Sequence, residues 1–196
     1  YTPRTLFPYT TLFRSLAPSL IAIEPVQAMA AQLAKLLPDV RLVNGTAESI
    51  PLASACADAL VCAQSFHWFS TQAALAEIHR VLKPDGRLGL VWNVRDESVD
   101  WVAAITAIIT PYEGDTPRFH SGKWREAFTG EYFSAPEMTC FPYNHVGSPQ
   151  EVIMDRVLSV SFIAALPAAE NAEVTAQLRN LIATHPALKE IGRAHV

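Results

Sequence analysis

The sequence predicts an α/β fold in which helices cover both faces of a mostly parallel, doubly wound sheet. Between Ser19 and Asn93, short apolar segments alternate with segments whose apolar residues recur at helical spacing. This alternation is typical of parallel sheets, because each crossover between parallel strands needs a connecting helix. Beyond Asn93 the alternation stops and helical patterns dominate. We therefore expect a C-terminal helical cap on the same domain.

The expected strands are short apolar runs bounded by turn residues or by polar residues. They are "SLIAIEP" (Ser19–Pro25), "VRLVNG" (Val40–Gly45), "ADALVCAQ" (Ala57–Gln64) and "RLGLVWN" (Arg87–Asn93). Each is too short for a buried helix and is followed by residues that favour a turn or a helix start.

The expected helices connect these strands. Apolar residues at helical spacing from Val26 to Leu37 indicate an amphipathic helix that stops at Pro38. A second helix, for which Ser70 is the expected cap, carries an apolar face through Leu82. The tetrapeptide "KPDG" (Lys83–Gly86) then predicts a turn into the next strand.

The C-terminal half favours helices over Val99–Ile109 and Glu170–Ala183, with one strand inside Ser134–His145. Ser148, followed by a proline and then by Glu151, has the pattern of a capping box. It predicts a helix that continues to about Leu158.

Both ends of the chain differ from the body between them. The DNA string "CTCTTCCGATCT" encodes Leu12–Ser15, and its reverse complement accounts for Ile191–Arg193 in another reading frame. A longer form of the same string, which resembles a short-read sequencing adapter, encodes Thr5–Ser15. We therefore expect residues 1–15 and 191–196 to be adapter-derived and residues 16–190 to be a partial domain. The protein encoded by the uninterrupted gene is called the parent protein below.

Composition excludes several classes of partner. The net charge of −4 gives no electrostatic case for binding nucleic acid or an anionic membrane. No apolar stretch reaches the roughly 18 residues that a membrane span requires. The three cysteines lack zinc-site spacing and are odd in number, which fits reduced thiols and predicts a cytoplasmic location. The histidines are scattered without ligand spacing, so we expect no metal. The sequence does not indicate the oligomeric state.

An acid that ends a strand is the first candidate for a site. In open α/β sheets, ligands bind outside the carboxyl ends of the strands, and an acid after the second strand commonly binds a ribose diol. Glu24 closes "LIAIE" and has that kind of position. A carboxylate that caps the next helix, or that is simply solvated, would give the same pattern.

Further segments extend this pattern. In order they are "NGTAESIPL" (Asn44–Leu52), the polar and aromatic end of "ADALVCAQSFHWF" (Ala57–Phe69), and "ALAEIHRVLKPDGRLGLV" (Ala74–Val91). They resemble the class I S-adenosylmethionine-dependent methyltransferases, in particular the broad type 11 group that acts on small molecules. The resemblance covers most of residues 16–93 and implies a Rossmann-like fold with S-adenosylmethionine as cofactor. Later segments such as "GKWREAF" (Gly122–Phe128) are similar, more weakly, to the cap of carboxyl methyltransferases of the trans-aconitate type.

The resemblance implies roles for the cofactor site. Glu24 would hold the ribose hydroxyls, Ala47 and Glu48 would border the adenine, and Gln64 and Ser65 would line the methionine side. For Glu48, an exposed loop acid is the alternative.

The resemblance also implies a place for the methyl acceptor, a small-molecule substrate. His67 is the candidate general base, and Trp68 would offer its ring face to the sulfonium. Local hydrogen bonding of His67 and packing of Trp68 under the cap are the alternatives. Arg95 would bind a substrate carboxylate, unless it pairs with a neighbouring acid. Trp92 and Trp101 are expected in the core or the cap.

The sequence departs from the family at both ends. Family members begin with a central strand and a glycine-rich loop that approaches the methionine end of the cofactor. Here the part of the chain that resembles the family starts at residue 16, just before the second strand, so this first strand and its loop are not matched. A final antiparallel strand is also absent after Ala183. We therefore expect methyl transfer, with a carboxylate as one possible acceptor, in the parent protein and little activity in this chain.

Two other functions remain open. An NAD-dependent oxidoreductase would also place an acid like Glu24 after its second strand, although it explains "FHWF" (Phe66–Phe69) poorly. A non-catalytic interaction module is the third reading. The sequence of the missing loop would distinguish these functions.

Overall fold

The computed structural model describes residues 19–143 and 145–189, so the predictions about both adapter-like ends lie outside the described residues. The described residues form two compact units, which are treated separately here. The sheet unit contains residues 19–93 and 117–138. The helical unit contains residues 94–116, 139–143 and 145–189.

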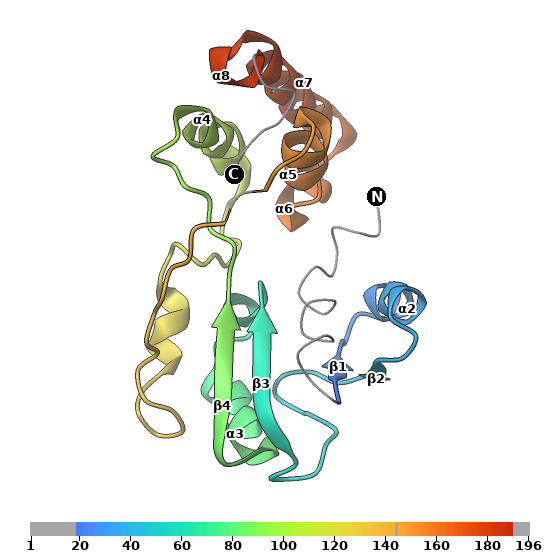
Figure 1. The fold of residues 1–196 in the computed structure, drawn as a ribbon, viewed down its shortest axis with the longest axis vertical. Helices are drawn as coiled ribbons and strands as arrows, with labels where there is room; N and C mark the ends of the chain where they lie inside the picture. The colour runs from blue at the N-terminus through green and yellow to red at the C-terminus, as the bar shows by residue number, and fades with distance from the viewer. Residues whose placement is uncertain (1–18, 144, 190–196) are drawn as a thin grey trace. The chain divides into compact units, whose positions relative to one another are not determined.

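The strands of the sheet unit lie where the sequence predicts them, and every pairing between them is parallel (Figure 1). Strand β1 (Ile21–Ile23) pairs with β2 (Arg41–Val43), so that Ile21 lies opposite Arg41. Strand β3 (Ala57–Ala63) pairs with β4 (Leu82–Val91), with Leu60 opposite Leu88. The predicted α/β class with parallel strands is confirmed.

Each strand pair has its own helix, and two distinct clusters of buried residues lie beside the pairs, although Ile23 of β1 also packs against the cluster of the β3–β4 pair. Helix α2 (Gln27–Leu36) joins β1 to β2 and buries Leu33 against apolar residues of that pair. Helix α3 (Gln72–Val81) joins β3 to β4, and its residues Leu75 and Ile78 lie in a separate, larger core. The cap of α3 is Thr71, whose hydroxyl oxygen accepts a hydrogen bond from the Ala74 N–H at 3.1 Å. The expected cap at Ser70 is therefore wrong by one residue.

The predicted turn at "KPDG" interrupts the β3–β4 ladder. Ala57 lies opposite Leu82, but Ala59 already lies opposite Arg87, so the four intervening positions of β4 loop out of register. Asp85 has a left-handed backbone with φ of 68°. A Cβ on Gly86 would lie 2.9 Å from the carbonyl oxygen of Lys83, which explains why glycine closes this turn.

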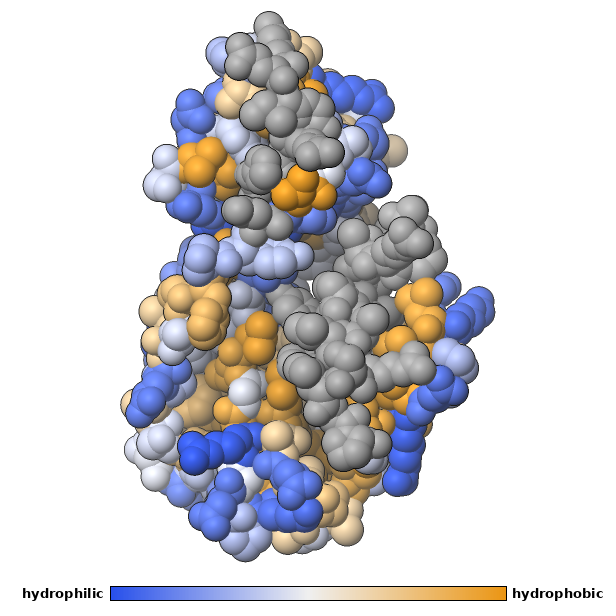
Figure 2. Space-filling view, in the orientation of Figure 1, coloured by the Kyte–Doolittle hydropathy of each residue, from blue (hydrophilic) through white to orange (hydrophobic). Residues whose placement is uncertain are grey.

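In the part of the chain that the structure describes, the two strand pairs are not hydrogen-bonded to each other. One edge of β1 and one edge of β3 therefore lack a described neighbour. Val61 on β3 keeps 40% of its surface exposed, although a strand inside a doubly wound sheet is normally covered on both faces. Figure 2 shows apolar surface over the strands of this unit.

The helical unit follows the predicted helices. Helix α4 (Asp100–Ile109) and helix α7 (Ala168–Thr184) pack together around a core that includes Trp101 and Leu178. The remaining elements of this unit are η3 (Thr110–Tyr112), η5 (Gln150–Asp155), α5 (Arg156–Leu158), α6 (Ser161–Ala164) and α8 (Pro186–Lys189).

The capping box at Ser148 is confirmed. The Ser148 hydroxyl lies 2.9 Å from Oε2 of Glu151, and the Glu151 N–H donates to the same hydroxyl at 3.3 Å. These hydrogen bonds open a helical segment that starts as the π-helix η5 and continues into α5, which ends at Leu158 as expected.

The strand expected within Ser134–His145 is wrong. The described residues of this segment form no strand, and Phe141 keeps 82% of its surface exposed. A strand needs a hydrogen-bonded neighbour, and no described strand pairs with this segment. Its alternating apolar residues are therefore not sufficient to form one.

Residues 117–138 pack with the sheet and not with the cap to which the sequence assigned them. They contain η4 (Lys123–Ala127), whose Trp124 lies in the same core as Phe66 and Ile78. The side chain of Gln72 at the start of α3 donates to the Ala127 carbonyl at 2.7 Å. The chain first passes from the sheet unit to the helical unit after Asn93, and residues 117–138 then return to the sheet unit.

A partly exposed ion pair between Glu77 and Arg80 on α3 should make the sheet unit sensitive to acid. Hydrogen bonds from Arg80 and from the Ile50 N–H lower the pKa of Glu77 from 4.5 to about 2. Because the folded pKa is the lower one, the stabilisation is present above about pH 4.5 and is lost as the pH falls towards 2. We expect Glu77→Gln to lose less thermal stability over this range than the original sequence does. Glu48→Gln, at an exposed carboxylate, is the control; equal losses in the Glu77→Gln variant and the original would contradict this.

Candidate functional site

The residues predicted to bind the cofactor follow the carboxyl ends of parallel strands. Glu24 follows β1, and its backbone N–H continues the ladder by donating to the Val43 carbonyl at 3.2 Å. Gln64 and Ser65 follow β3, and Trp92 follows β4. In open α/β sheets this edge is where ligands bind. Glu24, Gln64 and Ser65 thus follow strand ends, as the sequence predicted, whereas Trp92 was expected in the core or the cap and packs against the core of this unit. Binding of the cofactor by these residues stays a prediction.

The carboxylate of Glu24 has one oxygen engaged locally. Its Oε1 accepts a hydrogen bond from the Val26 N–H at 2.9 Å, next to the start of α2. This oxygen therefore caps the next helix, which is the alternative role that the sequence left open for Glu24. Among the described residues, Oε2 has no hydrogen-bond partner, so it remains available to a ligand hydroxyl. Capping also fixes the orientation of the carboxylate at the strand end.

The loop after β2 carries Ala47 and Glu48. Thr46 and Ser49 form a tight bridge, which leaves Glu48 exposed at the tip and Ala47 half-buried. The base of the loop is held from α3, because Arg80 donates to the carbonyls of Ile50 and Leu52, both at 2.9 Å. The loop is therefore anchored to the sheet unit. The roles of Ala47 and Glu48 towards an adenine stay predictions.

Gln64 has a left-handed backbone, with φ of 56°. Its N–H donates to the Val91 carbonyl at 2.8 Å, and its side chain reaches the Asn93 carbonyl at 3.4 Å. A non-glycine residue in this conformation is uncommon, and such strained positions concentrate at functional sites. The turn at Gln64 directs the chain from β3 into η2 (Phe66–Trp68).

His67 and Trp92 are joined directly across the ends of β3 and β4. The indole Nε1–H of Trp92 donates to Nδ1 of His67 at 3.0 Å. Burial and the positive charge of Arg118 lower the pKa of His67 from 6.5 to about 4. His67 is therefore neutral at physiological pH. The local hydrogen bond that the sequence left open as an alternative is present.

An aromatic cluster surrounds this pair. Trp92 lies 4.9 Å from Phe119 and 4.7 Å from Trp124 between ring centroids, and Phe66 packs edge-on against Trp124. The guanidinium of Arg125 lies 4.3 Å from the Trp124 ring centroid. Sequence reasoning missed Phe119 and Trp124 as parts of the site. The helical spacing of Trp124 and Phe128 in "GKWREAF" is the available signal, although the resemblance places this segment in the cap.

The predicted acceptor residues Trp68 and Arg95 are placed differently. Trp68 keeps 52% of its surface exposed, with its ring centroid 5.6 Å from that of His67. Its predicted contact with the cofactor sulfur stays a prediction. Arg95 belongs to the helical unit, so its predicted role towards a substrate carboxylate also stays a prediction.

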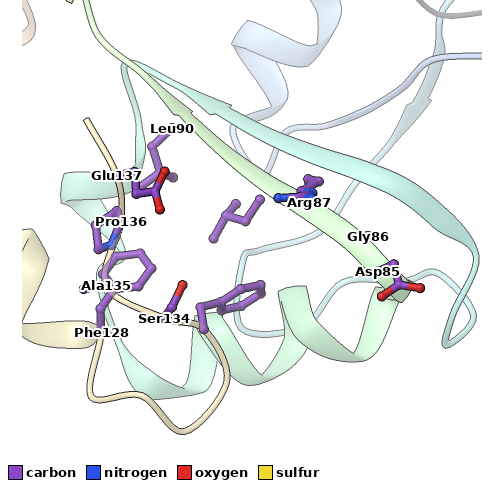
Figure 3. Close-up of a pocket in the computed structure, with 11 residues that line it drawn as sticks. Asp85, Gly86, Arg87, Leu90, Phe128, Ser134, Ala135, Pro136 and Glu137 are labelled. Atoms are coloured by element: carbon purple, nitrogen blue, oxygen red, sulfur yellow. The ribbon is translucent and has the colours of Figure 1, made fainter. Parts of the chain in front are cut away.

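A cavity of about 460 Å³ lies elsewhere in the sheet unit. Figure 3 shows its lining side chains coming from β4 on one side and from residues 128–137 on the other. None of the predicted site residues lines it. Its β4 lining runs along the strand from Asp85 to Leu90, whereas ligands of parallel sheets bind beyond the carboxyl ends of the strands. We therefore do not assign the cofactor to this cavity.

Within residues 19–143 and 145–189, no group of three or more histidine, cysteine, aspartate or glutamate side chains is arranged to hold a metal ion. The helices in the same residues include none long and apolar enough to cross a membrane.

The parallel sheet with polar residues after its strands defines the chain as an α/β protein of the Rossmann-like class. Comparison with known proteins identifies the family. A family model described as a methyltransferase domain matches residues 8–90. An uncharacterised methyltransferase of Schizosaccharomyces pombe is 35% identical over 180 residues, which cover 87% of this chain and 70% of that protein. The chain belongs to the class I S-adenosylmethionine-dependent methyltransferases.

Two further comparisons agree. A second Schizosaccharomyces pombe protein, an uncharacterised methyltransferase-like one, is 40% identical over 167 residues, 85% of this chain. The chain spans only 65% of that relative's length. A solved structure from Anabaena variabilis, assigned to an antibiotic biosynthesis pathway as a methyltransferase, matches with a TM-score of 0.63 over 98% of this chain and 84% of its own. At 14% identity this likeness shows the fold alone.

Removing the Glu24 carboxylate tests its predicted role. In the parent protein we expect Glu24→Ala to weaken S-adenosylmethionine binding by about 1.5–3 kcal/mol, the usual contribution of a hydrogen bond to a charged group. This corresponds to a roughly tenfold to hundredfold higher Kd in titration calorimetry. Glu97→Ala, at an exposed acid outside the sheet unit, is the control. An unchanged Kd for Glu24→Ala would remove this residue from the site.

Proposed function

We propose that the parent protein transfers a methyl group from S-adenosylmethionine to a small-molecule acceptor that carries a carboxylate. One observation carries this proposal. In a chain of the methyltransferase family, Glu24, Gln64 and the His67–Trp92 pair all lie just after the carboxyl ends of parallel strands. Nucleotide cofactors bind at this edge of such sheets.

The described residues fit part of a cofactor site. Glu24 offers a carboxylate oxygen to the ribose hydroxyls, Ala47 and Glu48 border the adenine, and Gln64 and Ser65 line the methionine side. The glycine-rich loop of the family is not among the described residues, and we propose that the parent protein supplies it upstream of residue 16. Without that loop, this chain transfers methyl groups poorly or not at all.

Methyl transfer asks little covalent chemistry of the protein. When bound, S-adenosylmethionine supplies a methyl group that is already activated by its positively charged sulfur. The protein must hold the acceptor in line with that methyl group and exclude water. The aromatic cluster around Trp92 and Trp124 provides an apolar wall for this purpose, and Trp68 offers an exposed ring next to His67.

The charges in this cluster support an anionic acceptor. Arg118 is close enough to lower the pKa of His67, and Arg125 stacks on Trp124. Arginine is well suited to binding a carboxylate through paired hydrogen bonds. Arg95 is a further candidate for that contact. A cytoplasmic location is part of the proposal, since Cys56, Cys62 and Cys140 are all unpaired.

The test is a transfer assay with the parent protein, methyl-labelled S-adenosylmethionine and small carboxylic acids, each matched with its amide. We expect label in the acids, recovered as base-labile esters, and none in the amides. Label that appears only in amines or phenols would overturn the proposal that the methyl acceptor is a carboxylate. A parent protein that neither transfers label nor binds S-adenosylmethionine would overturn the function itself.

A further inference from the structure

We infer that Trp92 holds His67 as a hydrogen-bond donor towards the methyl acceptor, so the acceptor atom must already be ionised when it binds. This inference rests on the proposed function and deepens it. It assigns Trp92 as a positioning residue and gives His67 a role other than the general base that the sequence suggested.

The hydrogen bond between the two rings determines which nitrogen of His67 carries the proton. An indole N–H can only donate, so Nδ1 of His67 must present its lone pair at the 3.0 Å contact. A neutral imidazole with an unprotonated Nδ1 carries its hydrogen on Nε2. Among the described residues, Nε2 has no hydrogen-bond partner, and this N–H is therefore available to a ligand.

The same contact opposes protonation of the ring. An imidazolium carries hydrogens on both nitrogens, so protonating Nδ1 would set two N–H groups against each other. The surroundings also disfavour the charged imidazolium. The ring is half-buried beside the aromatic cluster, and the positive charge of Arg118 lowers its pKa further. In this state neither nitrogen can take a proton from the acceptor without breaking the contact with Trp92.

This arrangement selects the class of acceptor. A neutral hydroxyl or an ammonium group must lose a proton in order to be methylated, and His67 offers no base for that purpose. A carboxylate needs no base: one of its oxygens bonds to the methyl carbon while the carbon–sulfur bond breaks. The sulfur keeps the bonding electron pair and becomes a neutral thioether. The Nε2–H of His67 would donate to the other carboxylate oxygen.

Nitrogen-15 NMR of the free parent protein tests the tautomer directly, with the His67 signals assigned by their loss in His67→Gln. We expect Nδ1 to be unprotonated and Nε2 protonated from neutral pH down to about pH 5. In Trp92→Phe, which keeps the ring but removes the donor, the signals should change to a mixture of tautomers. Trp124→Phe is the matched control, because the Trp124 indole donates to the Phe119 carbonyl instead. A protonated Nδ1 in the original protein would overturn the inference even if Trp92→Phe failed to fold.

Activity distinguishes a donor from a base. His67→Gln keeps an N–H donor but cannot take up a proton, and we expect it to retain activity towards a carboxylic acid within about tenfold. His67→Phe should lose about tenfold to a hundredfold, the range for a hydrogen bond to a charged group. A loss of about 10² to 10⁴ in His67→Gln would indicate a general base and contradict the inference. If no acceptor is methylated at all, the proposed function fails, while the NMR result still decides the tautomer.

Discussion

We expect the 196-residue chain to unfold at a much lower temperature than a version in which the upstream strand and loop proposed above replace residues 1–15. We expect the extended chain to unfold cooperatively and to be stabilised further by S-adenosylmethionine. The chain as printed should show a broad transition that the cofactor does not shift. Circular dichroism during heating, with and without cofactor, measures both effects.

The expected difference follows from the two separate strand pairs. Among the described residues, β1 pairs only with β2 and β3 only with β4, and the cores around Leu33 and Phe66 are distinct clusters, with Ile23 of β1 packed against the second. A strand between β1 and β3 would pair both edges and cover apolar residues such as Val61. Each unsatisfied buried backbone group costs about 1–3 kcal/mol, whereas a domain is stable by only about 5–15 kcal/mol. A few such groups therefore decide whether the domain folds.

The control for this experiment is an extension of equal length and composition in scrambled order. It separates the effect of a specific strand from the effect of a longer chain. Cooperative unfolding of the printed chain at the temperature of the authentic extension, with an upward shift on adding cofactor, would show that no strand is missing.

The second large effect is expected at Phe66. This side chain is fully buried, with its ring 5.6 Å from Phe69 and 6.4 Å from Trp124 between centroids. Truncating a fully buried phenylalanine leaves a cavity and typically costs about 3–5 kcal/mol. We expect Phe66→Ala in the parent protein to lose stability of this size in urea unfolding, with the slope of the transition unchanged.

Trp68→Ala is the matched control, since it removes a larger ring from the same short helix. Trp68 keeps 52% of its surface exposed, so its loss should cost under about 1 kcal/mol. Phe66 precedes His67 directly, and it therefore fixes the start of the segment that carries the histidine. Equal losses in the two variants would contradict this description of the core.

The sequence was sufficient to predict the elements whose signals are local. Alternating strands and helices, the turn at Lys83–Gly86 and the capping box at Ser148 all depend on residues within a few positions of each other. The cap of α3 was missed by one residue because Ser70 and Thr71 are both suitable caps, and only the backbone decides between them.

Contacts between distant residues could not be predicted in this way. The hydrogen bond from Trp92 to His67 joins residues 25 positions apart, and Trp124 reaches the same cluster from the segment after α4. The local sequence predicted that Trp124 lies in the cap and that His67 acts as a general base. Neither partner could be predicted, because no nearby residue indicates it. The strand expected within Ser134–His145 failed for a related reason, since a strand depends on a neighbour that the local pattern does not contain.

The central claim is that this chain is part of a methyltransferase whose cofactor lies along the ends of β1 and β3. Titration calorimetry of the parent protein with S-adenosylmethionine and, separately, with NAD tests it most directly. The account predicts one S-adenosylmethionine bound per chain, weakened roughly tenfold to a hundredfold by Glu24→Ala, and no heat of binding with NAD. Tight binding of NAD that depends on Glu24, without binding of S-adenosylmethionine, would contradict the account.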